Sequence, residues 1–253
     1  MYYESQGTGF PLVMVMGLGA NKDWWGPPLV DAISKKYKTI IFDNRGTGRT
    51  DTPETNFSIK TMADDTVGLM DALKIRKAHI LGISLGGMAA QELVLNHADR
   101  VEKLVLCSTM CGTSHSVMNP QVVVQLQSAG GQTPAEFING VIQLLYPPEF
   151  IKANPAIVKE TARLMLIAPT RQDMYMRQLG ATVTFDTYDR LPMIKTPTLV
   201  MHGKKDILIP PENGKIIADR IPGAKLVNFE KTGHALFTVE TDAVLKTLFQ
   251  FLG

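Results

Sequence analysis

The chain has 253 residues, of which 45% are hydrophobic and 20% are charged, and its formal net charge is +2. This balance suits one globular domain with a substantial core, and the near-neutral charge argues against a nucleic-acid partner. The N-terminus lacks the basic start and the apolar stretch of a signal peptide. The longest early apolar run, residues 11–16, is too short to cross a bilayer, so we expect a cytoplasmic protein that binds no membrane.

Apolar runs alternate with helical segments along most of the chain. Short β-rich runs predict strands at residues 12–16, 39–43, 78–82, 101–108, 198–203 and 224–230. These runs are almost continuously apolar, as expected for strands that are buried on both faces of a parallel sheet. Helices are expected at residues 59–73, 85–97, 211–221 and 242–252. The alternation predicts an α/β fold with right-handed crossovers, whose ligands bind beyond the carboxyl ends of the strands.

The alternation lapses at residues 112–191, which are rich in helix formers, methionines and aromatic residues. We interpret this segment as a helical cap inserted in a single domain, 1–253. An ordinary helical layer of the same domain is the alternative. Candidate substrate contacts in the cap are Tyr146, Met165 and Met174, although most of its apolar residues are expected to form the cap's own core.

Ser84 lies between the predicted strand 78–82 and the predicted helix 85–97, in a Gly-x-Ser-x-Gly pattern that runs from Gly82 to Gly86. At such a corner the serine hydroxyl is exposed beside the amide end of the helix, and only small residues fit two positions before and after it. A serine hydroxyl needs this exposure, a base, and donors for the charge that it creates. The pattern predicts that Ser84 is a nucleophile.

His234 is the expected general base, because it follows a predicted strand and a loop late in the chain. The expected acid is Asp206, which follows the strand 198–203, since Ser, Asp and His then occur in the order typical of this architecture. A solvated turn is the alternative interpretation of Asp206, and Glu230 is the reserve acid. His79 and His202 lie in predicted strands, and His97 ends a predicted helix, where a cation is favourable. His115 begins the expected cap and could line a pocket there.

Two backbone N–H groups are expected to stabilise the oxyanion. One belongs to Leu85, directly after the nucleophile, and the other to Leu18 in the glycine loop that follows the first predicted strand. The same loop imitates a dinucleotide-binding fingerprint, because Asp43 lies about 20 residues onward. Lys22 occupies the third small position, however, and Trp24 follows where a helix should open. We therefore expect no nucleotide cofactor.

Cys107 and Cys111 lie four positions apart at the end of a predicted strand. Two ligands do not complete a zinc site, and no Cys/His pair at the usual spacing could complete one. We interpret both residues as buried free thiols. Redox pairing is the alternative.

Four motifs together resemble those of the α/β-hydrolase family. They are Gly82-Ile83-Ser84-Leu85-Gly86-Gly87, Asp43-Asn44-Arg45-Gly46-Thr47-Gly48, Gly203-Lys204-Lys205-Asp206 and Gly233-His234. The likeness covers the chain outside the cap and is greatest to the branch of small esterases, enol-lactonases and cofactor-free haloperoxidases. It implies a mostly parallel eight-stranded sheet flanked by helices, with no cofactor and no metal.

The resemblance also implies roles for particular residues. The triad positions fall on Ser84, Asp206 and His234, and the oxyanion positions fall on Leu18 and Leu85. One departure concerns Met16, because many relatives carry histidine before the first loop glycine. A side-chain brace of the oxyanion loop is therefore missing from the sequence pattern.

The expected reaction is hydrolysis of small to medium acyl or aryl esters through an acyl-enzyme. The expected partner is a small-molecule ester or lactone, and a homodimer is left open. One alternative is a lactonase or C–C hydrolase for a small acidic substrate, for which the cap offers Arg163, Arg171, Arg177 and Arg190. The other alternative is a non-catalytic ligand-binding protein of the same fold.

Overall fold

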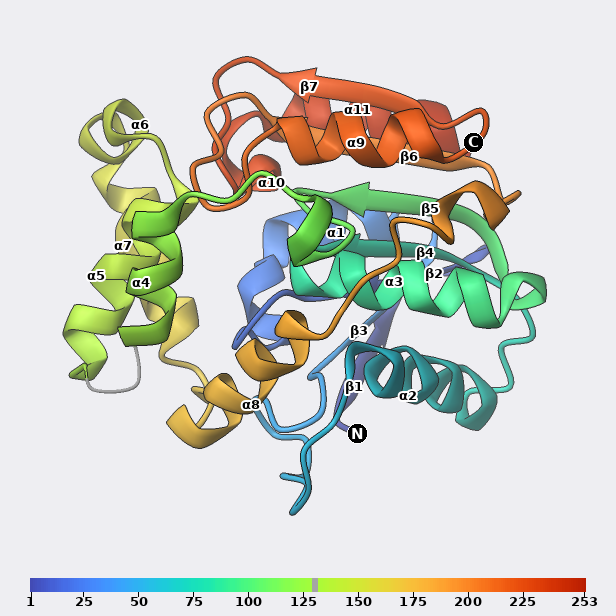
Figure 1. The fold of residues 1–253 in the computed structure, drawn as a ribbon, viewed down its shortest axis with the longest axis horizontal. Coiled ribbons are helices and arrows are strands. Elements are labelled where there is room, and N and C mark those ends of the chain that lie inside the picture. The colour runs from blue at the N-terminus through green and yellow to red at the C-terminus, as the bar shows by residue number, and fades with distance from the viewer. Residues whose placement is uncertain (129–131) are drawn as a thin grey trace.

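A seven-stranded sheet forms the centre of the computed structural model, which describes residues 1–128 and 132–253 (Figure 1). The strands follow the order β1-β3-β2-β4-β5-β6-β7. β1 is antiparallel to β3, and the other neighbouring pairs are parallel. The mostly parallel sheet is confirmed. The expected eight strands are corrected to seven in this part of the chain.

The inner strands are the apolar runs of the sequence, and the edge strands are more polar. The strands are β1 (Tyr3–Gln6), β2 (Pro11–Val15), β3 (Lys38–Phe42), β4 (Ala78–Ile83), β5 (Val101–Cys107), β6 (Thr198–Gly203) and β7 (Lys225–Phe229). Every residue of β4 and β6 is buried, whereas every residue of β1 is exposed. The sequence of β1, Tyr-Glu-Ser-Gln, has no apolar run, so apolar patterning could not reveal this strand.

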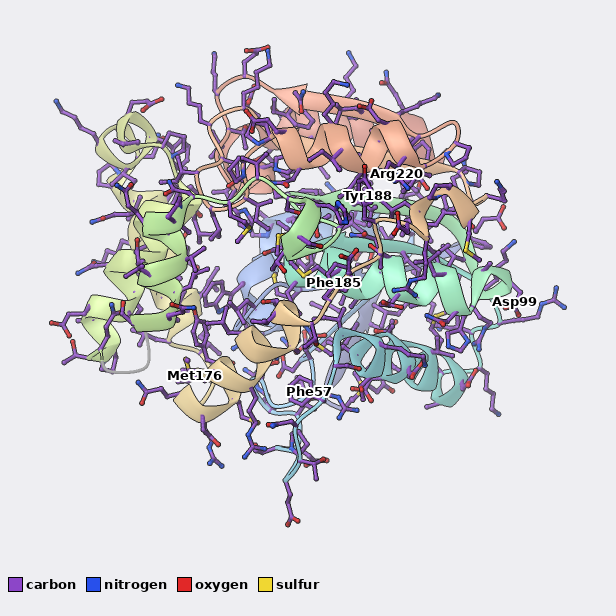
Figure 2. The ribbon with its side chains drawn as sticks, in the orientation of Figure 1. Phe57, Asp99, Met176, Phe185, Tyr188 and Arg220 are labelled. Carbon is purple, nitrogen blue, oxygen red and sulfur yellow. The ribbon has the colours of Figure 1, made fainter. Side chains whose placement is uncertain are left out.

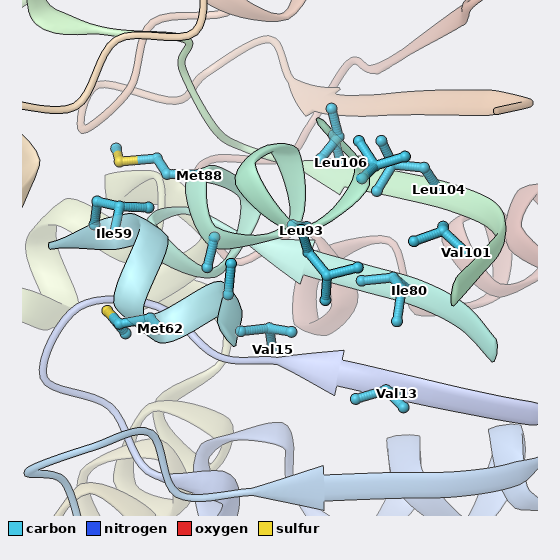
Figure 3. Close-up of a cluster of buried hydrophobic side chains, with 14 of the residues drawn as sticks. Val13, Val15, Ile59, Met62, Ile80, Met88, Leu93, Val101, Leu104 and Leu106 are labelled. Carbon is cyan, nitrogen blue, oxygen red and sulfur yellow. The ribbon is translucent and has the colours of Figure 1, made fainter. Parts of the chain in front are cut away.

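Helices cover both faces of the sheet. On one face lie α2 (Ile59–Ala72), α3 (Leu85–Asn96) and α9 (Glu212–Arg220), and on the other lie α1 (Pro27–Ser34) and α11 (Thr241–Leu252). Two hydrophobic cores result, because successive strand residues point to opposite faces. Val13 and Val15 belong to the first core, shown in Figure 3, and Leu12 and Met14 belong to the second.

Several short helices lie in the connections. They are α10 (Leu236–Val239) and the 3-10 helices η1 (Lys22–Trp25), η2 (Ala98–Arg100), η3 (Thr113–His115) and η5 (Leu191–Met193). Pro211 is the N-cap residue of α9, so this helix begins one residue later than expected. In the described part of the chain, no helix is both long and apolar enough to span a membrane.

Between β5 and β6 the chain forms further helices, at residues where the strand-helix alternation lapses. They are α4 (Pro120–Ser128), α5 (Pro134–Leu145), α6 (Pro148–Ala153), α7 (Pro155–Met165) and α8 (Gln172–Val183). Proline suits the first turn of a helix because that turn has no partner for its N–H group. The arrowheads of β5 and β7 point toward α4–α7, so these helices lie beyond the carboxyl ends of the strands (Figure 1).

The two ends of this helical segment are joined side by side. Gly112 forms an isolated β-bridge with Asp186, and Thr187 N–H donates to the Cys111 carbonyl oxygen at 2.7 Å. Tyr188 then stacks on His115, with ring centroids 3.9 Å apart, and the Arg220 guanidinium lies 3.8 Å from the Tyr188 ring centroid (Figure 2). The entry and exit of the segment are thus fixed to each other and to α9.

Candidate active site

Ser84 forms the corner between β4 and α3. Its backbone has φ of +56°, a conformation that non-glycine residues adopt rarely and at an energetic cost. A Cβ at Gly82 would lie 2.2 Å from the Gly86 carbonyl oxygen, and one at Gly86 would lie 2.1 Å from the Val15 carbonyl oxygen. The corner therefore excludes larger side chains at both positions. The Thr109 hydroxyl stabilises it by donating to the Ser84 carbonyl oxygen at 2.7 Å.

Asp206 and His234 come from the loops after β6 and β7 and lie in contact. His234 Nδ1 is 2.8 Å from Asp206 Oδ2, and both side chains are buried. The other carboxylate oxygen, Oδ1, accepts the N–H groups of Leu208 and Ile209, each at 2.9 Å. Burial alone would raise the pKa of Asp206, but the charge of His234 and hydrogen bonds from histidine outweigh it and lower this pKa to about 2. Asp206 is thus ionised, with both carboxylate oxygens hydrogen-bonded, and is not a solvated turn residue.

The backbones of Ser84 and His234 meet at the end of β5. Ser84 N–H donates to the Cys107 carbonyl oxygen at 2.9 Å. The hydroxyl of the next residue, Ser108, donates to the His234 carbonyl oxygen at 3.1 Å. Two consecutive residues therefore anchor the serine corner and the histidine loop at one point of the sheet edge, which is the edge where parallel sheets bind ligands.

A second histidine, His202, lies close to the Asp206 carboxylate. Its Nε2 is 2.8 Å from the Ile209 carbonyl oxygen and 3.5 Å from Asp206 Oδ2, so the carbonyl is its closer partner. Its Nδ1 has no hydrogen-bond partner in the described residues and lies where a Cβ at Gly214 would be 2.7 Å away. Sequence reasoning gave His202 no role. Its position near the end of β6, four residues before Asp206, could have indicated this contact.

The other candidate bases and acids are engaged elsewhere. His79 is buried between the rings of Phe10 and Tyr37. His97 Nε2 contacts Asp64 near the surface at 3.1 Å. Glu230, the reserve acid, is largely exposed and pairs with a lysine at 2.5 Å. These placements leave Asp206 as the acid that contacts His234.

The glycine loop after β2 lies against Ser84. A Cβ at Gly17 would lie 3.1 Å from the Ser84 Cβ, and Asn44 Nδ2 donates to the Met16 carbonyl oxygen at 2.9 Å. Within the described residues, the N–H groups of Leu18 and Leu85 donate to no other group of the protein. Neither expected oxyanion donor is thus engaged by another described residue, as a group that binds a substrate oxygen requires.

Asp43 is a structural residue and not a ribose ligand. Its carboxylate is fully buried and accepts the N–H groups of Lys22 and Arg49, each at 2.8 Å. Asp43 thus connects the backbone of the segment after β2 to that of the segment after β3.

Both cysteines are free and buried. Burial raises the pKa of Cys111 to about 11 and that of Cys107 further, which makes both thiols poor nucleophiles. In the described part of the chain, no group of three or more His, Cys, Asp or Glu residues could hold a metal ion.

A cavity of about 370 Å³ lies between the glycine loop and the helices beyond it. It is lined by Gly19, Trp24, Gln132, Pro134, Phe137, Ile138, Met165, Leu166, Pro169, Thr170, Gln172 and Tyr175. None of these side chains is charged, and most are apolar, as in pockets that bind neutral small molecules.

The three candidate substrate contacts are placed differently. Met165 lines the cavity. Tyr146 packs among α5, α6 and α7, and its hydroxyl lies 2.8 Å from that of Thr161. Met174 is fully buried against the turn at Gly46. Tyr146 and Met174 thus lie outside the cavity lining.

The fold and the sheet-edge site define the class of α/β hydrolases, and comparison with known proteins agrees. The model of the α/β-hydrolase fold family matches residues 11–241. The chain therefore belongs to the α/β-hydrolase family, and it is a hydrolase of this fold.

Relatives named in the comparison act on different bonds. The chain is 29% identical to a putative carbamate hydrolase RutD of Azorhizobium caulinodans, over 100% of this chain and 95% of that one. It is similar to the crystal structure of the enol-lactonase from Burkholderia xenovorans, with a TM-score of 0.88 and 27% identity over 99% and 95% of the two chains. The esterase of Exiguobacterium antarcticum gives a TM-score of 0.85 and 28% identity over 99% and 94%.

Proposed function

We propose that this chain hydrolyses carboxylic esters of small to medium acyl or aryl groups through a covalent acyl-enzyme. The observation that carries the proposal is the contact between Asp206 Oδ2 and His234 Nδ1, 2.8 Å, at the sheet edge where the strained Ser84 corner also lies. A serine hydrolase needs this contact between the acid and the base, because the acid fixes the tautomer and orientation of the base.

In the proposed reaction, Ser84 Oγ attacks the ester carbonyl carbon while His234 Nε2 takes the hydroxyl proton. The resulting oxyanion accepts the free N–H groups of Leu18 and Leu85. The carbon–oxygen bond of the leaving group then breaks, and His234 returns its proton to the departing alkoxide. Water deacylates the serine by the same steps, giving the carboxylic acid and the free enzyme.

The cavity is lined by Gly19 of the glycine loop and by none of the three triad residues, and its uncharged lining favours a neutral acyl group over an acidic substrate. The four arginines that could have bound a carboxylate are held elsewhere. Arg163 pairs with Glu160, Arg171 with Asp173 and Arg190 with Glu92. Arg177 donates to the carbonyl oxygens of residues 53 and 54. The cavity wall instead offers the Thr170 hydroxyl, which is buried and has no hydrogen-bond partner in the described residues.

Neutral lactones and carbamates are the second candidate substrates. Each presents a carbonyl with a heteroatom leaving group to the same serine, and similar proteins are named enol-lactonase and putative carbamate hydrolase. Rates on matched neutral esters, lactones and carbamates, compared as kcat/KM, would rank the three classes.

The first test is the substitution Ser84→Ala. We expect turnover of p-nitrophenyl esters to fall by about 10³-fold or more, because the nucleophile is lost while the oxyanion donors and the binding site remain. A fluorophosphonate should label the wild type at Ser84, as located by mass spectrometry, and should not label the variant.

Ser128→Ala is the matched control, because Ser128 is exposed at the end of α4, away from the sheet edge. It should keep full turnover and labelling. A Ser84→Ala variant with undiminished turnover would refute the proposal. A wild type that is labelled at Ser84 yet cleaves no ester would favour lactones, carbamates or a binding role.

A further inference from the structure

Helix α8 lies against the oxyanion loop, and its residue Gln178 bridges two loops. This side chain is fully buried. Its Oε1 accepts Gly19 N–H at 2.8 Å, and its Nε2 donates to the Arg45 carbonyl oxygen at 3.1 Å. Gly19 follows β2 and Arg45 follows β3, so one amide connects the ends of two neighbouring strands to a helix that lies 159 and 133 residues further along the chain, respectively.

A second α8 residue covers the same loop. Tyr175 precedes Gln178 by three positions, so both side chains lie on one face of the helix. A Cβ at Gly19 would lie 2.7 Å from the Tyr175 ring, and Gly19 has φ of +65°. The loop backbone at Gly19 therefore packs directly against the side chains of Tyr175 and Gln178.

These contacts determine which loop N–H group is available. Gly19 N–H is bound to Gln178, and Ala20 N–H donates to the Gly17 carbonyl oxygen at 3.3 Å. Leu18 N–H, in contrast, donates to no group of the protein among the residues described. The bond to Gln178 fixes the Leu18–Gly19 peptide plane, and the bond from Ala20 restrains the Gly17–Leu18 plane, which carries the Leu18 N–H.

We propose that Gln178 is a positioning residue that orients the oxyanion loop by binding Gly19 N–H and the Arg45 carbonyl oxygen. The inference rests on the proposed function, because it assigns Leu18 N–H to the oxyanion. Gln178 thus supplies, from α8, the side-chain brace that the sequence pattern at Met16 lacks. It acts with Asn44, which holds the Met16 carbonyl oxygen at the start of the loop.

The test replaces Gln178 by methionine, which is similar in length and lacks both hydrogen-bonding groups. Because a displaced oxyanion donor raises the barrier without weakening ground-state binding, we expect kcat to fall about 10–100-fold with KM changed less than about threefold. The rate of fluorophosphonate labelling at Ser84 should fall in parallel, since that reaction also develops charge on the bound oxygen. Affinity for an ether analogue of the ester, which has no carbonyl, should stay within about twofold.

Thr182→Val is the matched control, because Thr182 lies on α8 and its hydroxyl donates to the Leu179 carbonyl oxygen in the same helix and to no other described residue. Its kcat should stay near that of the wild type. If Gln178→Met impairs folding, Gln178→Asn keeps an amide that is one methylene too short to reach both loops, and the same loss of kcat is expected.

Unchanged kcat in a folded Gln178 variant, with an active wild type, would overturn this proposal alone. Equal losses in kcat and in affinity for the ether would also overturn it, because they would indicate general disorder of the pocket. A wild type that is neither labelled at Ser84 nor active on any ester would refute the proposed function itself, and this assignment with it.

Discussion

At the scale of single residues, His79 is a buried ionisable group outside the site. It lies in β4 between the rings of Phe10 and Tyr37, and its Nδ1 has no hydrogen-bond partner among the described residues. Burial, followed by the charge of nearby Lys103, lowers the pKa of His79 to about 4. The imidazole is therefore neutral in the folded chain at neutral pH, as its aromatic surroundings require.

A pH dependence of stability follows. The unfolded chain takes up a proton at His79 near pH 6.5, whereas the folded chain resists it until about pH 4. Since the folded pKa is depressed, the contribution of His79 is present above pH 6.5 and is lost as the pH falls toward 4. We expect protonation of His79 in the unfolded chain to lower the free energy of unfolding by about 3 kcal/mol between pH 6.5 and pH 4, as measured by urea denaturation.

His79→Leu should remove most of this dependence of the free energy of unfolding on pH. His97→Leu, at a partly exposed position, should leave the dependence nearly unchanged. An unaltered pH dependence in His79→Leu would contradict the assignment.

Asp206 affects stability at lower pH, because its pKa is lowered from 3.8 to about 2. Its contribution is present above about pH 4 and is lost as the pH falls through 2.

At the scale of elements, two glycines in neighbouring helices show that the effect of adding a methyl group depends on its position. Gly68 lies inside α2, and a Cβ there would meet no atom within 4 Å. Gly86 lies in the first turn of α3, where a Cβ would meet the carbonyl oxygens of Val15, at the end of β2, and of Met16. One glycine has no steric role in its helix, and the other lets α3 approach the sheet.

Gly68→Ala should stabilise the protein by about 0.5–1 kcal/mol, because alanine lowers the entropy cost of forming a helix. Gly86→Ala should destabilise it by about 3 kcal/mol or more and lower turnover, because α3 and Ser84 must move away from β2. Thermal unfolding and p-nitrophenyl ester assays measure both effects. Equal changes in the two variants would show that the strand-to-helix corner tolerates a methyl group.

At the scale of the whole molecule, the cavity belongs to two parts of the chain that are distant in sequence. Gly19 and Trp24 come from the segment after β2, whereas its other lining residues come from positions 132–175. The paired ends of the helical segment, at Gly112 and Asp186, limit how far the two sides can separate. The proposed substrate range therefore depends on how these parts pack and not on the sheet alone.

Enlarging a lining residue should narrow that range. Ile138→Trp places a larger side chain in the cavity, so we expect kcat/KM for octanoyl esters to fall about tenfold or more, while acetyl esters change less than about threefold. A p-nitrophenyl ester series of increasing acyl length measures this. Ile157→Trp, at an exposed position of α7 outside the lining, is the control and should leave the profile unchanged. An unchanged profile in Ile138→Trp would mean that the acyl chain binds elsewhere.

The strands other than β1, and the sheet edge that carries the candidate site, could be predicted from the sequence. Apolar runs follow from burial on both faces, and the Gly-x-Ser-x-Gly corner follows from steric limits between neighbouring residues. Placing Asp206 and His234 after consecutive strands brought them to one edge, where the structure finds them in contact. Their catalytic roles stay predictions.

The tertiary structure alone decided the contacts between distant segments. Apolar periodicity carries no signal for the exposed strand β1, and no local pattern links Gln178 to Gly19. The positions of the four arginines in residues 112–191, and the identity of the residues there that line the cavity, depend on how the helices pack. Neighbouring residues determine local conformation, so it can be predicted from the sequence. Packing depends on contacts between segments that are distant in sequence, so only the tertiary structure shows it.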